Sequence, residues 1–573
     1  MNRDTLRLGI LILICVIIVS FPIYTGRIFA GEDILFQLNR IEGIKEGLLA
    51  GQFPVRIHAY QVNGYGIPLG IFYPDLFLYL PAMLRLLDIP IDLSFQSFCF
   101  MVILSMAYVS WYSFSILAKL AQYKNYIHIG AMTAILYISY WYVFLDLYKR
   151  TDIGETLALV FFPLVLATVL SVLFGDVRKW PMAVIGIAGI GYSHIISSLF
   201  LTGFLLVIFT LNWKCLLQKQ RFQAFIKVII FGLLVNMAIL IPFLYFYFNM
   251  DFRMPLLYDS NLVQQISGNS WDRWSVEFFL GLQLLWGVPV LVILFLFLVY
   301  WYKNKTKVPK LVKMAFFFSM LFMFISTNAF PWDSFCSLPG MGWLNKIQFP
   351  WRFMELATPC ITFCAAVGLI KFIELKKYYL VFLVLLSLSI CILNISIFSN
   401  YMDYQQNTQN SKEQYRGDGL PTYSFDGSND YLYDGISFEK LKNPDGDILL
   451  PTDIYSDVDL ISFNKQGSSI KFSYRSEQVG FIQVPLFYYE GYKAENENRE
   501  LLPISHNQDH VMTLVLPKGN HEINVWYAGL PIFKIGDSIS LLSIILFLYS
   551  VYIENRRRFR RIRNMEKFIL HQN

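Results

Sequence analysis

Charged residues are scarce in this sequence. They make up 15% of its 573 residues, whereas soluble globular domains carry about 25%. Hydrophobic residues make up 55% and aromatic residues 17%, with 51 Phe and 35 Tyr. A soluble chain of this length needs more charged surface than this composition supplies, which excludes an ordinary water-soluble enzyme. The sequence therefore predicts a mainly α-helical, polytopic membrane protein.

Cysteine is scarce as well. The chain has 7 Cys, and none lies between residues 399 and 535, where the sequence is most polar. Cys336 is the one cysteine that we expect on the exterior side. A disulfide framework is therefore excluded in the polar stretch. No Cys or His spacing is typical of a zinc site, so we expect no bound metal.

Two kinds of motif are missing. The sequence has no evident glycine-rich nucleotide-binding fingerprint, so no motif indicates a sugar nucleotide as substrate. No strong internal repeat or pair of inverted halves is visible, although many secondary transporters have one. The function must therefore be read from individual polar residues and from the layout of the chain.

Long apolar runs dominate what is present. A helical span needs roughly 20 apolar residues to cross about 30 Å of hydrocarbon. About twelve segments qualify, although 181–194 is too short to cross alone and is expected to be tilted or half-inserted. They are 7–25, 93–118, 127–145, 157–175, 181–194, 196–212, 223–246, 283–301, 311–328, 353–371, 378–398 and 536–553.

Lys and Arg residues set the expected orientation, because cytoplasmic loops retain positive charge. "DVRKW", "NWKCLLQKQRFQAFIK", "WYKNKTKVPKLVK", "KFIELKK" and the tail "ENRRRFRRIRNMEK" would all lie on one side. The first span lacks a small-residue cleavage site and reads as a retained helix. We therefore expect a multi-pass protein of a bacterial cell membrane with both termini in the cytoplasm. The tethered basic tail favours anionic lipid over nucleic acid as its partner.

The chain divides into three predicted parts. Residues 1–398 form a transmembrane domain with a long first exterior loop at 26–92. Residues 399–535 contain 11 Lys and Arg against 19 Asp and Glu, a net of −8, which leaves +14 for the rest. We interpret 399–535 as an extracytoplasmic, β-rich, sandwich-like domain, because "SSIKFSYR" alternates and "HVMTLVLPKGNHEINVWY" reads as two strands around a turn. Residues 536–573 form the last span and the tail.

The first exterior loop begins with "FAGEDILFQLNRIEGIKEG". Apolar residues recur at 34, 38, 41, 44 and 48, and the polar residues Gln37, Arg40, Lys45 and Glu46 lie elsewhere on the helical wheel. This pattern predicts an amphipathic helix over Ile34–Leu49 that lies in the interface, with its polar face toward water. Asp33 stands at its N-terminus, where Asp is a favoured cap and suits the positive dipole end. The reciprocal capping box is incomplete, because Phe36 occupies the place of Glu or Gln. Capping and catalysis both stay open for Asp33.

Other ionisable residues collect at the expected exterior ends of apolar helices. Each has an ordinary structural explanation: snorkelling for the Lys and Arg residues, a helix-start acid for Glu155, and an interfacial or core histidine for His194. A stronger signal than any one of these residues is that all of them are expected on the same, exterior side of the membrane. They are Asp75, Lys149, Arg150, Asp152, Glu155, His194, Lys346 and Arg352.

Several of these segments resemble a known family. The sequences "GEDILFQLNRI", "YKRTDIGETLA", "SHIISSLF", "IQFPWRFMELATP" and "VPLFYYEGYKAENENRELLPISHNQDHVMTLVLPKGNHEINVWYAG" look like those of YfhO-like bacterial membrane proteins. A related label is the 6-pyruvoyl-tetrahydropterin synthase-related membrane family, although the zinc-binding pattern of the soluble synthase is absent. The resemblance covers nearly the whole chain. That family is similar in layout to GT-C integral-membrane glycosyltransferases.

The resemblance implies a polyprenyl-phosphate sugar donor and an essential acid in the first exterior loop. It makes Asp33 the candidate catalytic base, with Glu32 beside it. The commoner family pattern has His or Gly before the Asp, which leaves open which acid acts. Exterior Arg150, Arg352 and Lys346 are the candidates for binding the donor phosphate. Membrane lipids and an envelope glycopolymer or glycolipid acceptor are the other expected partners.

Two alternatives remain. The protein could be a lipid or solute transporter or flippase, although few ionisable residues lie in the middle of the predicted spans, where they usually mark pathways. It could also be an envelope-assembly scaffold with an exterior binding domain. A scaffold would explain the domain at 399–535 but would not need an acidic first loop.

Overall fold

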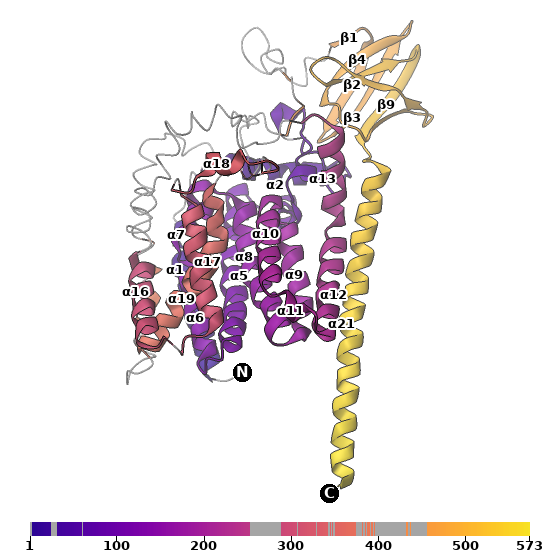
Figure 1. Cartoon of the computed structure of the whole chain (residues 1–573). Helices are drawn as coiled ribbons and strands as arrows, with labels where there is room; N and C mark the ends of the chain where they lie inside the picture. The colour runs from indigo at the N-terminus through magenta and orange to yellow at the C-terminus, as the bar shows by residue number, and fades with distance from the viewer. Residues whose placement is uncertain are drawn as a thin grey trace.

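The structure is a computed structural model of the whole chain. It describes residues 3–24, 31, 33–59, 61–252, 288–305, 307–327, 329–341, 344, 347, 350–373, 431–433, 436 and 455–572, and residues 381, 384–385, 387–389, 391–392 and 395. A helical bundle carries a small β-domain at one end (Figure 1), and the chain termini lie toward the other end. Helix α21 (Pro531–Gln572) runs alongside the bundle and extends beyond it. The mainly α prediction is confirmed.

The helices of the bundle follow the apolar runs. Two pairs of consecutive helices are bent at a short break between them. The bend is 41° between α6 and the segment Trp141–Arg150, and 63° between α12 and α13. The bounds are α1 Arg3–Val19, α5 Ile91–Leu120, α6 Tyr126–Ile138, α7 Trp141–Phe144, the π-helix η4 Leu145–Arg150, α8 Ile153–Phe174, α9 Trp180–Gly191, α10 Ile195–Leu211, α11 Trp213–Leu216, α12 Lys219–Val235, α13 Met237–Asn249, α16 Val288–Lys303, α17 Lys310–Ile325, α18 Trp332–Cys336 and α19 Met354–Ile373.

The number of spans differs from the predicted twelve. Among the described residues, four helices are long and apolar enough to cross a membrane, or six if each bent pair counts as one span. Helix α9 has 12 residues, about 18 Å at 1.5 Å per residue, which is too short to cross. The predicted span 378–398 lies largely outside the described residues. A membrane protein is supported, and the count of twelve is not confirmed.

Burial separates central helices from peripheral ones. Most of the apolar window of α8 is buried, as is most of the window of α19, whereas only 28% of the window of α21 is buried. A helix that is apolar all round and buried belongs in the interior of a bundle. Helices α8 and α19 therefore form its centre, and α21 exposes apolar side chains such as Leu541 and Ile545 where lipid would lie.

Helix α2 spans Ile34–Leu49, the range that the periodicity predicts. Ile34, Leu38, Ile41 and Ile44 are buried as expected. The expected solvated polar face is wrong, however, because Gln37 and Arg40 are buried too. The Arg40 side chain forms an ion pair with Asp75 of the first loop and donates a hydrogen bond to Gln37 within α2. The helix is thus enclosed on both sides and does not lie half-immersed in an interface.

The β-domain consists of two antiparallel sheets. One has the strand order β1-β4-β8-β7 and the other β2-β3-β9-β5-β6. Alternate residues of β3 (Ile470, Phe472 and Tyr474) are buried in a core that both sheets share. The bounds are β1 Tyr455–Ser456, β2 Asp459–Gln466, β3 Ser469–Ser476, β4 Gly480–Phe487, β5 Tyr492–Asn496, β6 Leu501–Leu502, β7 Ile504–His506, β8 Val511–Leu516 and β9 Gly519–Tyr527.

The predicted turn between β8 and β9 connects the two sheets. Strand β8 pairs with β4 and β7, whereas β9 pairs with β3 and β5. The two predicted strands exist, but they do not form a hairpin. Gly519 has a φ of 129°, a conformation that favours glycine. The linker before the strands lies mostly outside the described residues.

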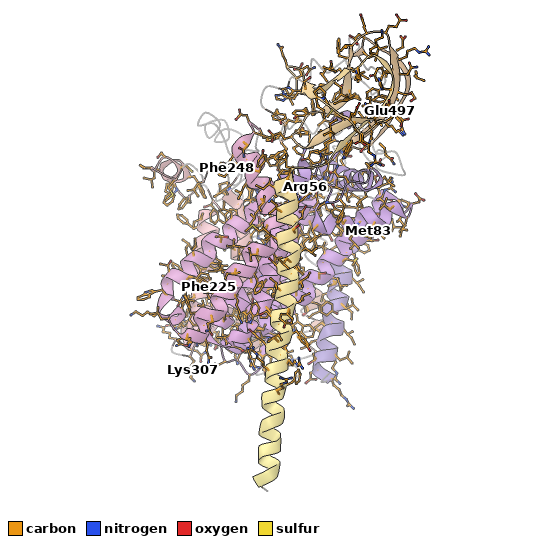
Figure 2. All side chains as sticks on the ribbon, turned by 90° about the vertical axis from the view of Figure 1, so that its right-hand side faces the viewer. Arg56, Met83, Phe225, Phe248, Lys307 and Glu497 are labelled. Carbon is orange, nitrogen blue, oxygen red and sulfur yellow. The ribbon has the colours of Figure 1, made fainter. Side chains whose placement is uncertain are left out.

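The sandwich is anchored on the first loop of the membrane domain. Ser468, in the β2–β3 turn, lies 2.8 Å from Gln52 Nε2, which donates to its hydroxyl. The Phe487 N–H donates to the Tyr65 carbonyl at 3.0 Å. Arg56 pairs with Asp537 of α21 at 2.7 Å, and Figure 2 shows Arg56 where the sandwich meets the bundle, with Lys307 at the far end. The sandwich and helix α21 thus both hold the first loop in place.

Lys465 makes this anchorage sensitive to pH. Its amino group, on β2, donates to the carbonyls of Gly64 and Pro485, and burial lowers the pKa of Lys465 to about 7. The unfolded chain, with the ordinary lysine pKa of about 10.4, binds a proton that the folded chain lacks between these values. Stability gains a contribution as pH rises through this window, and loses it as pH falls toward 7.

We therefore predict that Lys465→Met flattens the pH dependence of thermal unfolding. The melting temperature of wild type should rise relative to that of the variant between about pH 7 and pH 9. Lys493→Met, at an exposed position on β5, is the control and should follow wild type. Parallel curves for wild type and Lys465→Met would contradict the assignment of the titration to Lys465.

Candidate functional site

A cluster of charged side chains is buried where η4 ends and α8 begins. Arg150 Nη1 lies 2.5 Å from Asp146 Oδ1 and 2.9 Å from Glu155 Oε2, and its Nη2 lies 3.0 Å from Asp152 Oδ2. Asp146 and Glu155 have no measurable exposure. Three carboxylates therefore surround one guanidinium inside the protein, and the cluster depends on a sharp turn between the two helices.

The turn occurs at Thr151. Its φ is 59°, in the left-handed region that few non-glycine residues adopt. The reversal brings the acids of α8 back toward Arg150 at the end of η4. Asp152 then caps α8, because its side chain accepts a hydrogen bond from the Glu155 N–H at 3.1 Å. Asp152 thus stabilises the helix start and pairs with Arg150 at the same time.

Arg352 completes the cluster from a distant part of the sequence. It lies in the 3-10 helix η8 (Pro350–Phe353) that leads into α19, and its Nε donates to Glu155 Oε2 at 3.1 Å. Its Nη2 lies 3.5 Å from Asp152 Oδ2. Burial alone would raise the pKa of Asp152, but the Arg150 and Arg352 guanidinium groups hold it below its usual range. Asp152 is therefore ionised at neutral pH.

A second polar cluster lies in the first loop. Arg40 Nε donates to Asp75 Oδ1 at 3.0 Å, and His58 Nε2 lies 2.8 Å from Asp75 Oδ2. Arg40 also donates to Gln37 at 2.8 Å. Burial alone would raise the pKa of Asp75, yet Arg40 and His58 lower it. Asp75 is therefore a buried anion that holds a cation and an imidazole together.

Tyr73 connects the two clusters. Its hydroxyl donates to Asp152 Oδ1 at 2.9 Å, and its ring lies 4.1 Å from the guanidinium carbon of Arg40, within cation–π range. Burial and the Asp152 charge raise the pKa of Tyr73 well above its usual value, so it remains a hydrogen-bond donor. The first loop and the start of α8 thus share one continuous polar network.

His194 lies beside this network. Its ring centroid is 5.5 Å from that of Tyr73. Its Nδ1 accepts from the Ser197 N–H at 3.4 Å, so that it caps α10, and lies 2.7 Å from the Ser197 hydroxyl. Burial lowers the pKa of His194 to about 4. The imidazole is therefore neutral at pH 7 and positions the start of α10.

Asp33 is positioned next to the buried cluster by its backbone. Its N–H donates to the Arg150 carbonyl at 2.7 Å. Gly31 packs so closely on Thr151 that a Cβ would lie 1.6 Å from its hydroxyl, and a larger residue would push the loop away. Asp33 occupies the N-cap position of α2, but its side chain makes no capping hydrogen bond to that helix. The half-buried carboxylate is thus not committed to capping.

An apolar cavity of about 190 Å³ lies between α10, α17 and α19. Phe353 and Leu356, the neighbours of Arg352 and Glu355 in sequence, form part of its wall. The other lining residues are also almost all apolar. They are Leu199, Phe200, Gly203, Phe204, Val207, Phe318, Leu321, Phe322, Leu344 and Ile347. An apolar cavity therefore begins within one helical turn of the charged cluster.

Four predicted site residues converge in the buried cluster: Arg150, Asp152, Glu155 and Arg352. Snorkelling is therefore wrong for the two arginines, which are 6% and 3% exposed and ion-paired. Asp75 belongs to the first-loop cluster instead. Glu32 and Lys346 lie outside the described residues, and Lys149 is half-buried.

Sequence reasoning missed other members of the network. Asp146 stands four residues before Arg150, and Glu355 three residues after Arg352, so each shares a helical face with a predicted arginine. A spacing of three or four residues from a predicted arginine was the signal in the sequence that could have identified both acids. Arg40 was assigned to a solvated face, and His58 was not considered. Within the described residues, no group of three or more His, Cys, Asp or Glu side chains is arranged to hold a metal ion.

Comparisons with known proteins do not assign this chain to a family. No family model matches the chain. A Lactococcus lactis subsp. cremoris (strain MG1363) protein described only as uncharacterized is 24% identical over 227 residues, which cover 39% of this chain and 36% of that protein. The match therefore spans about a third of the relative's length.

Among the solved structures that this chain resembles in part is a membrane protein from another bacterium. ArnT from Cupriavidus metallidurans, in a crystal structure with undecaprenyl phosphate, shares 13% identity over 69% of this chain and 72% of its own, with a TM-score of 0.40. At this TM-score the likeness does not show that the two chains share a fold. The YfhO-like and GT-C-like resemblances stay predictions.

Proposed function

We propose that this protein is a membrane glycosyltransferase that transfers a sugar from a polyprenyl-phosphate donor to a cell-envelope acceptor on the extracytoplasmic side, with Asp33 as general base. One observation carries the proposal. Asp33, at the start of α2, makes no capping bond, while its backbone is fixed to the Arg150 carbonyl beside a buried ionic cluster. A carboxylate that does not cap its own helix, and whose backbone is fixed beside the cluster, is in a position to act as a general base.

The proposed reaction balances with these groups. The Asp33 carboxylate removes the proton from an acceptor hydroxyl, and the hydroxyl oxygen bonds to the anomeric carbon of the sugar. The bond from that carbon to the phosphate oxygen breaks, and polyprenyl phosphate leaves with the electron pair. A positioned general base contributes typically about 10² to 10⁴ in rate. Glu32, which precedes Asp33, is the alternative base.

The donor phosphate would lie near the exterior ends of η4 and α19, where Arg150 and Arg352 are. Both guanidinium groups already face carboxylates, so part of their role is to fix the loop that holds Asp33. In the proposal Arg352 contributes to phosphate binding, because its neighbours line the apolar cavity. Lys346 remains a candidate for the same role.

The lipid chain of the donor would enter the bundle between α10, α17 and α19. The cavity there is lined by Phe and Leu side chains, and burial of apolar chain in such a site is favourable by about 25 cal/mol per Å². The sugar and phosphate then remain in water at the helix ends. The sandwich, anchored on the first loop, would bind or orient the acceptor without taking part in the chemistry.

Topology is tested by cysteine labelling in intact cells, in a background without the native cysteines. A cysteine in place of exposed Ser505, on β7 of the sandwich, should react with a membrane-impermeant reagent from outside. A cysteine in place of exposed Gln218, which precedes α12, should react only after permeabilisation, because its basic neighbours should be retained in the cytoplasm. The reverse pattern would place the candidate site on the wrong side for an extracytoplasmic acceptor.

Function in cells is tested by measuring sugar incorporation into envelope polymers with and without the gene. We expect one glycan modification to disappear on deletion and to return with the wild-type gene. An unchanged envelope under conditions in which the protein is made would count against transfer and in favour of the scaffold alternative.

A further inference from the structure

A second, larger pocket lies at the end of the bundle far from the sandwich. It has a volume of about 880 Å³ and opens where η5 (Val177–Lys179), α12 and α21 meet. Figure 1 shows α12 and α21 side by side there, with α21 continuing past the other helices. The proposed sugar transfer makes no use of this pocket.

The pocket is basic. Five basic and two acidic side chains line it, which gives a net charge of +3. The basic ones are Arg178, Lys179, Lys227, Arg557 and Arg558, and the acidic ones are Asp176 and Glu554.

The two acids are already neutralised by neighbours. Asp176 accepts hydrogen bonds from Arg178 Nε at 2.6 Å and Nη2 at 2.8 Å. Glu554, on α21, pairs with Lys227 of α12 and accepts from Trp180 Nε1 at 3.0 Å. The remaining positive charge belongs to Lys179, Arg557 and Arg558. The Lys179 amino group donates to a neutral group, the Tyr112 hydroxyl, at 2.8 Å.

The pocket has an apolar side as well as a basic one. Trp180, Pro181, Ala224 and Val551 line it, and the Trp180 ring packs against Phe547 of α21 with ring centroids 5.7 Å apart. Tryptophan is typical of the depth at which lipid headgroups meet acyl chains. The apolar part of α21 that leads away from the pocket is largely exposed. A ligand here would meet cations at one end and lipid-facing helix at the other.

We propose that this pocket binds the headgroup of an anionic phospholipid. Its phosphate would lie against Lys179, Arg557 and Arg558, and its acyl chains would follow the exposed apolar part of α21. Basic pockets between transmembrane helices on the cytoplasmic side are a known mode of binding such headgroups. A bound lipid would reinforce the Glu554–Lys227 contact and hold α21, which carries the sandwich at its other end, against the bundle.

The test uses the full-length protein in detergent, titrated with phosphatidylglycerol or with neutral phosphatidylcholine, with bound lipid counted by native mass spectrometry. Arg557→Gln/Arg558→Gln removes two charges from the pocket. Arg556→Gln/Arg560→Gln removes two charges from the same helix at positions that do not line it. Because all four side chains are exposed, both variants should fold, which a melting curve checks.

We expect affinity for phosphatidylglycerol to fall roughly tenfold or more in the pocket variant and about twofold or less in the control. Equal losses in both variants, no loss in either, or equally tight phosphatidylcholine binding would overturn the proposal. Saturating inorganic phosphate should not displace the lipid. Displacement would reassign the pocket to a free anion and would also overturn it.

Discussion

Asp33→Asn should lower the rate of sugar transfer at least about 10²-fold while the protein still inserts and binds its donor. The substitution keeps the size and shape of the side chain and removes its negative charge and its ability to accept a proton. Asn caps a helix about as well as Asp, so a purely structural role predicts a mild effect. The rate should be measured at saturating donor and at matched protein levels in the membrane.

Glu32→Gln is the matched control for this prediction. It removes the neighbouring carboxylate and should be milder if Asp33 is the base. A large loss in Glu32→Gln with near-normal Asp33→Asn would exchange the roles of the two acids. Near-normal rates in both variants would leave the first loop without a catalytic acid and would favour transport or scaffolding.

Arg352→Met should destabilise the protein by about 3–5 kcal/mol, the range for removing one partner of a buried ion pair. Arg352 is 3% exposed, and its loss leaves Glu155 and Asp152 with Arg150 as their remaining arginine partner. Methionine has a similar length, so that the packing around η8 changes little. The free energy of unfolding should be compared with wild type by denaturant titration in the same detergent.

Arg178→Met provides the exposed counterpart. Arg178 pairs with Asp176 at 2.6 Å, closer than the 3.1 Å between Arg352 and Glu155. Its side chain is 60% exposed, however, and surface pairs contribute at most about 1 kcal/mol. Adding Glu155→Gln to Arg352→Met should recover part of the loss, because it removes a buried charge that has lost one of its two arginine partners. Equal effects of the two Arg→Met changes would show that the cluster is not buried as described.

The sequence predicted the elements whose signal is local. Helix α2 begins and ends where the apolar period does, and β3 follows the alternation of Ile470, Phe472 and Tyr474. It also placed Arg150, Asp152 and Glu155 close together, because they share one short segment. In these cases the physical cause, a periodic apolar face or chain proximity, can be read directly from the residues.

The network around the candidate site could not be predicted in full, because it depends on tertiary contacts. Arg352 and Glu155 are 197 residues apart, and nothing in either segment specifies that they meet. Arg40 appeared to belong to a solvated face, since periodicity cannot show that the first loop folds over α2 and buries both sides. The contact of Lys465 with Gly64 likewise joins segments 401 residues apart.

The most direct test of the central claim uses purified protein in proteoliposomes that contain a polyprenyl-phosphate-linked sugar and a soluble acceptor on the sandwich side. The account predicts release of polyprenyl phosphate in step with glycosylated acceptor, at least about 10²-fold faster for wild type than for Asp33→Asn. Movement of intact donor to the opposite leaflet, without release of polyprenyl phosphate, would contradict the account and identify the protein as a transporter.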